Sequence, residues 1–388
     1  MRIGVEACTW SNRRGYGRFV RELLTQMIED FPEHEFVLVV DEHSAKECDF
    51  PEAATVEIVA TSAQPTEAAS AAGSRSPADL YRMARAVAGL PLDVFFFPTR
   101  YSYFPLIRPV KTVIAFHDAT AERHPSLIFP DARARLFWRI KTLLALRQAD
   151  RLVTVSEDAR RQIADVFRCD ESDIGVITEG PDPVFGVRDD TSAFASVRAR
   201  YDLPSETPIV LYVGGISPHK NLDGLLRAMS DIPQPWHLAL VGEYEKDSFY
   251  GCQAELAQLT RDLGLAEHVT FTGFVPDEDL AVLYNDATLL VLPSFSEGFG
   301  LPVIEAMASG LPVAASDRNS LPEVLGPAGL LFDPLKVDEI RHAVGRLLAE
   351  PDLRAECRAR GLERSELFTW SAAARRMMSI LEEAAGPS

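Results

Sequence analysis

Residues 289–305 read LLVLPSFSEGFGLPVIE. The apolar run predicts a buried strand, and the glycines followed by Pro302 predict a tight turn into a helix. Such a turn leaves backbone N–H groups at the positive end of the helix, where anions bind. Glu297 in the loop and Glu305 in the helix can reach opposite ends of one polar ligand. A plain strand–helix connection is the alternative, but the arrangement of all nine residues from 297 to 305 favours a ligand site.

The same strand-then-helix pattern recurs along the whole chain. Short apolar runs such as 151–155 and 208–213 alternate with amphipathic stretches such as 156–167 and 222–229, which predicts parallel sheets covered by helices. Because 388 residues exceed one compact core, we expect two doubly wound α/β domains. The boundary falls in the proline-rich segment 181–208. Residues 61–79 are rich in alanine, serine and proline, which predicts a surface loop.

Charge is distributed unevenly. The chain has 57 acidic and 39 basic residues, a formal net charge of -18. Residues 1–200 hold 25 basic and 29 acidic side chains, and residues 201–388 hold 14 and 28. Residues 101–150 reverse this balance, with 8 basic against 4 acidic. The acidic total excludes a nucleic-acid binder that works by general phosphate attraction, but the basic island leaves room for an anionic acceptor.

Cysteine usage and hydropathy indicate a cytoplasmic chain. The five cysteines are scattered without a CxxC pair, which is typical of a reduced protein without structural zinc. The first residues lack the pattern of a secretory signal, and no apolar run reaches the ~18 residues of a membrane span. No pair of carboxylates at a predicted strand end suggests a bound metal ion.

Two further motifs follow predicted strands. Gly214 and Gly215 let a ligand approach the backbone after strand 208–213, and Lys220 offers a compact cation for phosphate. A surface lysine that caps a turn is an equally good interpretation of that motif by itself.

His117 and Asp118 end the predicted strand 112–116, at the edge where α/β sheets present ligands. The histidine can donate to a sugar hydroxyl, while Asp118 fixes its tautomer or contacts substrate. The alternative is a helix cap beside a structural histidine.

Gly15 and Gly17 precede the predicted helix 18–28. A dinucleotide fingerprint needs a third glycine where Val20 stands, and these glycines come too late after the first strand. A dehydrogenase is therefore disfavoured, and a looser phosphate-contacting loop is left.

Together these motifs resemble the retaining glycosyltransferases of glycosyltransferase family 4, which have the GT-B fold. The resemblance runs through GYGRF (15–19), HD (117–118), VSEDA (155–159), YVGGISPHKN (212–221) and the long block from FTGF to LPEV (271–324). It implies two Rossmann-like doubly wound domains facing a cleft. The expected divisions are an acceptor-side domain over 1–185, a nucleotide-sugar domain over 186–370, and a helix over 371–388 that packs back on the first domain.

The resemblance also implies residue roles. His117, Glu297 and Lys220 would form the catalytic set, with His117 near the reacting centre, Glu297 near the donor sugar and Lys220 neutralising the diphosphate. Glu305 would bind the ribose hydroxyls, and Phe274 and Val275 would contact the base. The full donor-binding set would be Gly15, Gly17, Asp118, Gly214, Gly215, Phe274, Val275, Gly298, Phe299, Gly300, Leu301 and Glu305.

One position departs from the family pattern. Many members carry an arginine shortly before the lysine, whereas this loop reads GISPHK over residues 215–220. Either the second cation is absent from this loop, or it is replaced by His219 or by an arginine from elsewhere in the chain, for which Arg318 is the candidate.

The implied reaction is hexosyl transfer, of a mannosyl-like or glucosyl-like unit, from a GDP- or UDP-linked sugar to a saccharide or lipid-linked acceptor. It would retain the anomeric configuration and use no metal ion or cofactor, in polysaccharide or glycoconjugate biosynthesis. The alternatives are a GT-B-like sugar-nucleotide epimerase and a non-catalytic sugar-nucleotide-binding relative.

Two features suggest the acceptor side. Arg100, Tyr101 and Tyr103 lie in an aromatic loop after a predicted strand, and aromatic rings stack well on sugars. The predicted helix 131–150 mixes five basic residues with apolar ones. One interpretation is a helix that contacts the inner face of an anionic membrane or holds an anionic acceptor. The other, a core-packing helix with a solvated basic face, is favoured.

Overall fold

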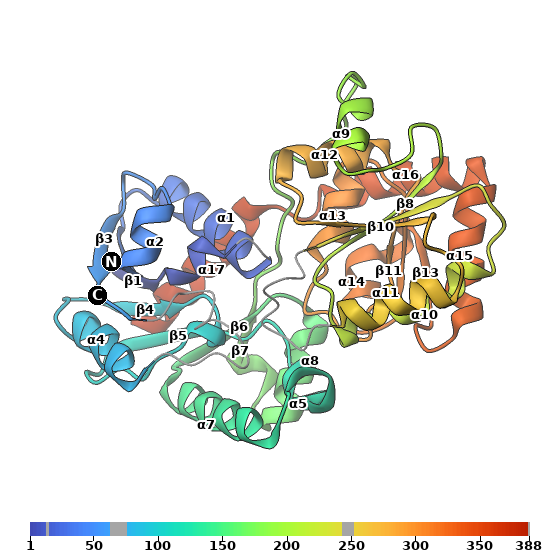
Figure 1. Ribbon diagram of the computed structural model, residues 1–388. Coiled ribbons are helices and arrows are strands. Elements are labelled where there is room, and N and C mark those ends of the chain that lie inside the picture. Colours follow the sequence, from blue (N-terminus) through green and yellow to red (C-terminus); the bar gives the residue numbers. More distant parts are fainter. Residues whose placement is uncertain (13–14, 63–75, 243–251, 387–388) are drawn as a thin grey trace. The chain divides into compact units, whose positions relative to one another are not determined.

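The computed structural model describes residues 1–12, 15–62, 76–242 and 252–386 (Figure 1). The chain divides into two compact units. Unit 1 comprises Met1–Glu179 and Thr369–Ser388, and unit 2 comprises Gly180–Phe368. The sequence predicts these boundaries after residues 185 and 370. Within the described ranges, no helix is both long and apolar enough to cross a bilayer.

Unit 1 is built on a parallel sheet of seven strands in the order β3-β2-β1-β4-β5-β6-β7. The strands are β1 (Arg2–Glu6), β2 (Glu35–Asp41), β3 (Thr55–Val59), β4 (Val94–Phe97), β5 (Lys111–Ala115), β6 (Arg151–Thr154) and β7 (Ile174–Val176). Ile3 pairs with Phe36 on one side and with Val94 on the other. The order therefore reverses between β1 and β4, and such a switch point is where open α/β sheets bind ligands.

Helices connect the strands of unit 1. They are η1 (Cys8–Ser11), α1 (Gly15–Asp30), α2 (Glu42–Glu47), α4 (Pro77–Ala88), η2 (Arg100–Ser102), α5 (Thr120–Arg123), α6 (Pro125–Ile128), α7 (Ala132–Gln148), α8 (Glu157–Phe167), η3 (Glu171–Asp173) and α17 (Trp370–Ala385). The last of these returns from the far end of the sequence. Its Trp370 ring lies 6.2 Å from the Phe19 ring of α1, and Ser371 Oγ donates to Asp30 over 3.1 Å.

Unit 2 repeats the architecture with six parallel strands in the order β10-β9-β8-β11-β12-β13. They are β8 (Ile209–Val213), β9 (His237–Val241), β10 (Val269–Gly273), β11 (Leu289–Leu292), β12 (Val313–Ser316) and β13 (Leu330–Phe332). The connecting helices are α9 (Phe194–Arg200), η4 (Pro218–Lys220), α10 (Leu222–Ser230), α11 (Gln253–Asp262), α12 (Asp277–Asp286), α13 (Leu301–Ala308), α14 (Leu321–Leu325), η5 (Gly326–Ala328), α15 (Val337–Ala349) and α16 (Pro351–Ser365). Here the order reverses between β8 and β11.

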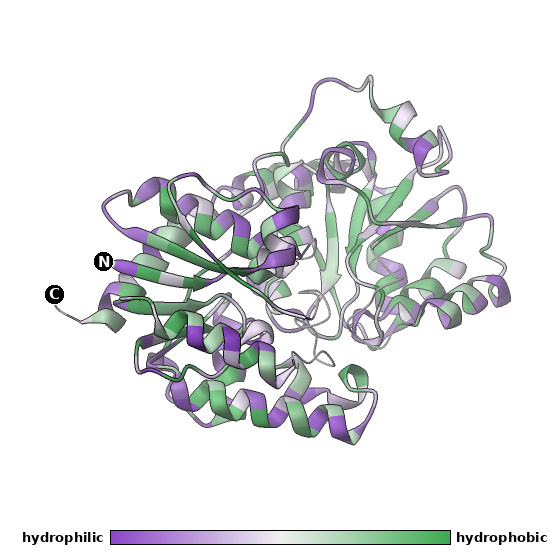
Figure 2. Cartoon of the chain, turned by 60° about the vertical axis from the view of Figure 1, so that its left-hand side comes forward, coloured by the Kyte–Doolittle hydropathy of each residue, from purple (hydrophilic) through white to green (hydrophobic). Residues whose placement is uncertain are grey.

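The strands of both units lie at the centre of the core. They are predominantly apolar, and Figure 2 shows green strands between helices of mixed colour. Continuous apolar runs of this kind are typical of parallel sheets that are covered on both faces. The predicted α/β class, with two doubly wound parallel sheets, is confirmed.

One predicted segment differs from the structure. The predicted loop 61–79 ends early because α4 begins at Pro77, where the Ser76 hydroxyl caps the helix by accepting from the Asp79 N–H over 3.1 Å. The Asp79 carboxylate is buried and accepts hydrogen bonds from Ser62. The middle of this loop lies outside the described residues. The predicted boundary segment 181–208 holds the helix α9, which Arg198 ties to Asp286 of α12 over 3.0 Å.

Candidate functional site

Two of the predicted catalytic residues meet in unit 2. Lys220 follows β8 and Glu297 follows β11, and these strands are neighbours at the switch point. The Lys220 ammonium donates to both Glu297 oxygens, over 2.7 and 2.9 Å. Their side chains are 17% and 13% exposed. An ammonium group has three N–H donors, so one remains beyond the two that Glu297 accepts.

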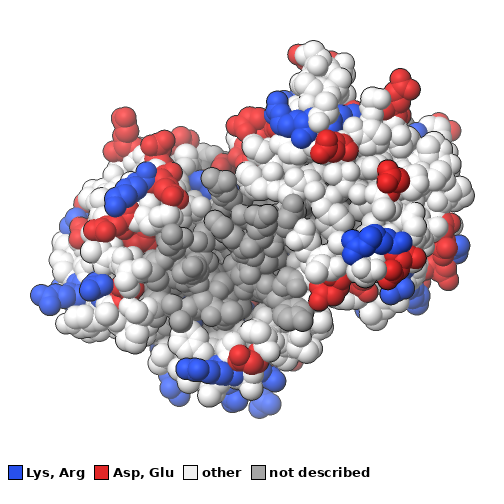
Figure 3. Space-filling model, viewed as in Figure 1, with Lys and Arg blue, Asp and Glu red and all other residues white. Residues whose placement is uncertain are grey.

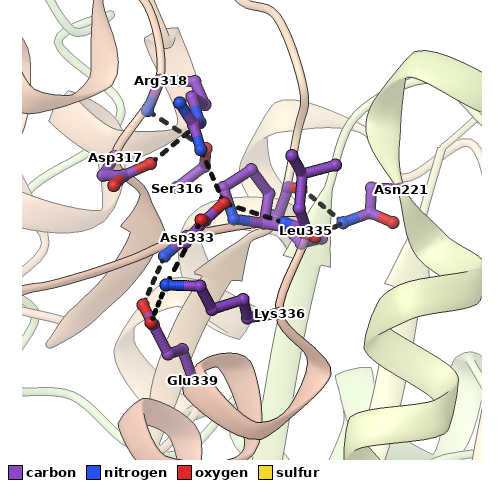
Figure 4. Close-up of polar contacts among 10 residues, drawn as sticks. Asn221, Ser316, Asp317, Arg318, Asp333, Leu335, Lys336 and Glu339 are labelled. Atoms are coloured by element: carbon purple, nitrogen blue, oxygen red, sulfur yellow. Dashed lines mark hydrogen bonds and ion pairs between the residues drawn. The ribbon is translucent and has the colours of Figure 1, made fainter.

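The Lys220–Glu297 contact is held by the backbone around it. Ser294 Oγ donates to Glu297 Oε1 over 2.6 Å, and the Phe295 N–H donates to the His219 carbonyl over 2.8 Å. Asn221 has a left-handed backbone conformation, and its amide donates to the carbonyls of Pro293 and Pro334 (Figure 4). The loops after β8, β11 and β13 are therefore tied together.

The loop 297–301 ends in the open N-terminus of α13. Gly300 has a φ of 111°, and a Cβ there would lie 2.8 Å from Leu321 Cδ2, so glycine is required. The Ser320 hydroxyl lies within hydrogen-bond distance of the Glu297 and Phe299 carbonyls. No side chain in the described part of the chain caps this helix, so its positive end can bind an anion.

Glu305 lies on the buried side of α13. It is 2% exposed, and its Oε2 accepts a hydrogen bond from the Tyr284 hydroxyl over 2.9 Å. Tyr284 belongs to α12 and is fully buried. A contact of Glu305 with ribose hydroxyls stays a prediction.

The remaining predicted donor residues of unit 2 follow β8 and β10. Gly214 has a φ of 153°, and its carbonyl oxygen lies only 1.9 Å from the place of a Cβ on Gly242. The Tyr212 hydroxyl donates to the Gly215 carbonyl over 2.7 Å. After β10, Phe274 is 40% exposed and Val275 only 3%. Of these two side chains, Phe274 therefore offers the larger surface to a base.

Arg318 is not a free second cation in this structure. Its guanidinium contacts Asp333 Oδ1 over 2.7 Å and Asp317 Oδ1 over 3.1 Å (Figure 4). The hydrogen bond to Asp333, together with Asp317, raises the pKa of Arg318. The other candidate, His219, is buried, and its Nδ1 lies 3.1 Å from Ser217 Oγ.

His117 and Asp118 lie beyond β5 in unit 1. His117 Nε2 is 2.8 Å from the Pro98 carbonyl, which can only accept, so this nitrogen carries the proton. The expectation that Asp118 fixes the tautomer is therefore corrected. Asp118 Oδ1 accepts from the Thr120 N–H over 2.8 Å instead. His117 Nδ1 faces Glu179 Oε1 at 3.8 Å, a neighbour that no local motif announced.

Arg100 lies inside unit 1. It is 2% exposed and donates to Glu122 over 3.1 and 3.0 Å and to the Asp118 carbonyl over 3.1 Å. Its guanidinium also lies 4.9 and 4.8 Å from the Phe116 and Trp138 rings.

Tyr101 and Tyr103 lie inside unit 1 as well. They are 4% and 3% exposed, and burial raises the pKa of both hydroxyls. The expectation that Arg100, Tyr101 and Tyr103 present faces to an acceptor does not fit this burial.

Gly15 and Gly17 stand in the first turn of α1, because the helix begins at Gly15 and not at residue 18 as predicted. A Cβ on Gly17 would lie 1.7 Å from the Asn12 carbonyl oxygen, so the glycine permits this close approach. Their contact with phosphate stays a prediction.

The structure adds contact residues that no sequence motif indicates. Four residues contact a predicted site residue although no local sequence motif marks them: Ser294, Ser320, Tyr284 and Glu179. Among the residues described, no three of the His, Cys, Asp and Glu side chains gather as ligands for a metal ion.

Comparison with known proteins gives the family. Residues 13–185 match the model of Glycosyltransferase Family 4, and residues 194–364 match that of Glycosyl transferases group 1. The Escherichia coli O-antigen chain mannosyltransferase B is 33% identical over 270 residues, 67% of each chain. The serotype-specific mannosyltransferase WbdA of Escherichia coli is 32% identical over 271 residues. That match covers 68% of this chain but 32% of WbdA, so the chain spans about a third of that relative.

Solved structures give the fold. Sucrose-phosphate synthase from Thermosynechococcus elongatus matches with a TM-score of 0.77 at 22% identity, over 98% of both chains. Anabaena HepE, solved with UDP and glucose, matches with a TM-score of 0.73 at 19% identity, over 98% of this chain and 99% of HepE. The fold is thus GT-B, as the resemblance implied. A family model matches each half of the chain, and the chain covers two thirds of a relative that is 33% identical to it. The chain therefore belongs to glycosyltransferase family 4.

Proposed function

We propose that the protein is a hexosyltransferase, which moves a sugar from a nucleoside diphosphate to a hydroxyl of a saccharide or lipid-linked saccharide. The observation that carries this proposal is the contact between Lys220 and Glu297. This contact joins a cation to a carboxylate at the switch point of the sheet in unit 2. Glu297 lies three residues before Gly300, where the N-terminus of α13 begins without a side-chain cap from the described residues. A diphosphate needs fixed positive groups, and sugar hydroxyls are bound well by carboxylates.

The donor is a GDP- or UDP-linked hexose in this proposal. The matched Escherichia coli relatives are named as mannosyltransferases, and Anabaena HepE has been solved with UDP-glucose. Lys220 and the 298–301 backbone would hold the diphosphate, Glu297 the sugar and Glu305 the ribose. Phe274 and Val275 would contact the base. Unit 1 would serve the acceptor, and His117 would act on the donor sugar.

The chemistry proposed is substitution with retention on one face of the sugar. The bond from the anomeric carbon to the phosphate oxygen breaks, and the acceptor oxygen bonds to that carbon from the same side. The acceptor proton passes to the leaving phosphate, whose charge Lys220 and the helix end stabilise. No metal ion or cofactor has a part in this scheme. A product of inverted anomeric configuration would overturn it.

The test is release of nucleoside diphosphate from a panel of GDP- and UDP-linked hexoses. Lys220→Ala and Glu297→Ala should each lower turnover by about 10²-fold or more, as when one fixed donor to a developing charge is lost. Lys336→Ala is the matched control, since Lys336 is a lysine of the same unit that is 61% exposed. Circular dichroism would check that the variants fold.

Other outcomes identify the alternatives. Unchanged turnover in Lys220→Ala and Glu297→Ala would overturn the site. An isomerised sugar nucleotide without released diphosphate would indicate an epimerase, and nucleotide binding without any turnover would indicate a non-catalytic relative. We place the reaction in the cytoplasm, consistent with five free cysteines.

A further inference from the structure

An apolar stripe faces outward along α7 in unit 1. The exposed side chains are Leu136 (58%), Phe137 (42%), Ile140 (50%), Leu143 (44%) and Leu144 (39%). At 100° per residue their positions cover about 120° of the helix surface, so they form one face. Only thirteen large apolar residues are exposed in the described chain, and five of them lie here. Such a concentration marks an interaction surface.

The opposite face of α7 fixes the orientation of this stripe. Trp138, Thr142 and Ala145 are buried against unit 1. The Trp138 indole N–H donates to Glu122 over 2.7 Å, and its ring lies 4.8 Å from the Tyr101 ring. The helix cannot rotate to bury the stripe without breaking these contacts. The interpretation favoured from the sequence, a core-packing helix with a solvated basic face, fits these buried side chains, but the solvated face also carries the apolar stripe.

Basic side chains lie at both ends of the stripe and along one side of it. Arg133 and Arg147 lie along its line at the two ends, and Arg135 and Arg139 flank it; all four are exposed. Residues 132–149 contain no acidic side chain, in a chain of net charge -18. Lys and Arg gather on the surface over α7 (Figure 3). An anionic surface would thus be attracted by this helix, although the chain as a whole is negatively charged.

We propose that α7 docks on an anionic phospholipid bilayer. The stripe would enter the boundary between headgroups and acyl chains, and the arginines would contact the lipid phosphates. A second copy of the chain fits less well, because a two-fold contact through α7 would bring the same arginines of both copies together. The inference concerns the surface of unit 1 and does not depend on the proposed glycosyl transfer.

The experiment is co-sedimentation of the full chain with vesicles. One set is made of phosphatidylcholine alone, and the other includes phosphatidylglycerol. Binding should require the anionic lipid and weaken with salt, because the Debye length falls from about 10 Å at 0.1 M to about 3 Å at 1 M. Equal and negligible binding to both sets would overturn the proposal.

Variants separate the two contributions. Arg135→Ala and Arg139→Ala should each weaken binding about fivefold. Phe137→Ser combined with Ile140→Ser should weaken it at least tenfold through lost apolar burial. The matched control is Leu335→Ser combined with Leu367→Ser, at two exposed leucines of unit 2 that are 72% and 67% accessible.

Two results would contradict the membrane assignment even if wild-type binding were seen. One is an equal loss of vesicle binding in the leucine control. The other is a concentration-dependent dimer that Phe137→Ser/Ile140→Ser abolishes while vesicle binding persists, which would assign the stripe to a second copy.

Discussion

Two ion pairs, one in each unit, differ in how far they are exposed. Lys220 pairs with Glu297 in unit 2, with side chains 17% and 13% exposed. Arg100 pairs with Glu122 in unit 1, but Arg100 is 2% exposed and also contacts the Asp118 carbonyl and two aromatic rings. Burial by itself would lower the pKa of Arg100, but Glu122 and Asp118 raise it above its ordinary value.

The difference separates a structural cation from the cation that we propose binds the donor. The Arg100 guanidinium is enclosed by partners of its own unit, so a ligand would have to displace them. The Lys220 ammonium is accessible and keeps a donor beyond those that Glu297 accepts. Both residues follow a strand in a loop of mixed character, and exposure is what assigns them different roles.

The largest expected effect is on the stability of unit 1. Arg100→Leu leaves the Glu122 carboxylate without its buried partner, which should lower the free energy of unfolding by about 3–5 kcal/mol. Urea denaturation measures it. The control is Arg108→Leu, because Arg108 is exposed and makes one hydrogen bond, of 3.3 Å. Removing both charges, with Glu122→Leu added, should restore part of the loss. A loss below about 1 kcal/mol in Arg100→Leu would show that the cluster is not structural.

The second prediction concerns the Lys220 side of the comparison. A nucleoside diphosphate at 100 times its Kd should stabilise the wild-type protein by about 2.7 kcal/mol. Lys220→Met should lose most of this increment at the same ligand concentration, because the cation that meets the diphosphate is gone. Lys336→Met should keep it. If Lys220→Met were stabilised as much as the wild type, the ammonium would not be a ligand group.

The local sequence pattern predicted the strands, the helices and several turns. It predicted little about which side chains are exposed. The EGFGLP sequence indicates the turn at Gly300, and Gly300 has a positive φ in the structure. The meeting of Lys220 and Glu297, 77 positions apart, depends on β8 lying beside β11, an order that the sequence does not reveal. In α7, apolar residues occur on nearly every side, so periodicity could not say that Trp138 points inward and Ile140 outward. Partners from distant segments decide such questions.

A buried group can also lack a partner of opposite charge among the described residues. His237 in β9 is 7% exposed, and its Nε2 lies 2.9 Å from Thr270 Oγ1. Burial, with help from His268 and Arg198, lowers its pKa from 6.5 to about 4. Between these values the unfolded chain binds a proton that the folded chain does not, so stability should fall as the pH drops from 6.5 towards 4.

The dependence of the unfolding free energy on pH corresponds to the binding of at most one proton. His237→Gln, which can still donate to Thr270, should flatten the curve of unfolding free energy against pH in this window. His43→Gln is the control, since His43 is partly exposed beside Glu47. An unchanged curve in His237→Gln would mean that other groups cause the acid sensitivity.

The smallest expected effect is at Arg318, which tests the missing second cation of the donor loop. This guanidinium is 43% exposed and lies against Asp333 and Asp317. Exposed pairs of this kind contribute little, so Arg318→Ala should change stability by no more than about 0.5 kcal/mol. Turnover with nucleotide sugars should also stay near the wild type, because two carboxylates already neutralise the charge. A tenfold loss of turnover without a loss of stability would instead make Arg318 a binding cation like Lys220, released from its carboxylates when the diphosphate arrives.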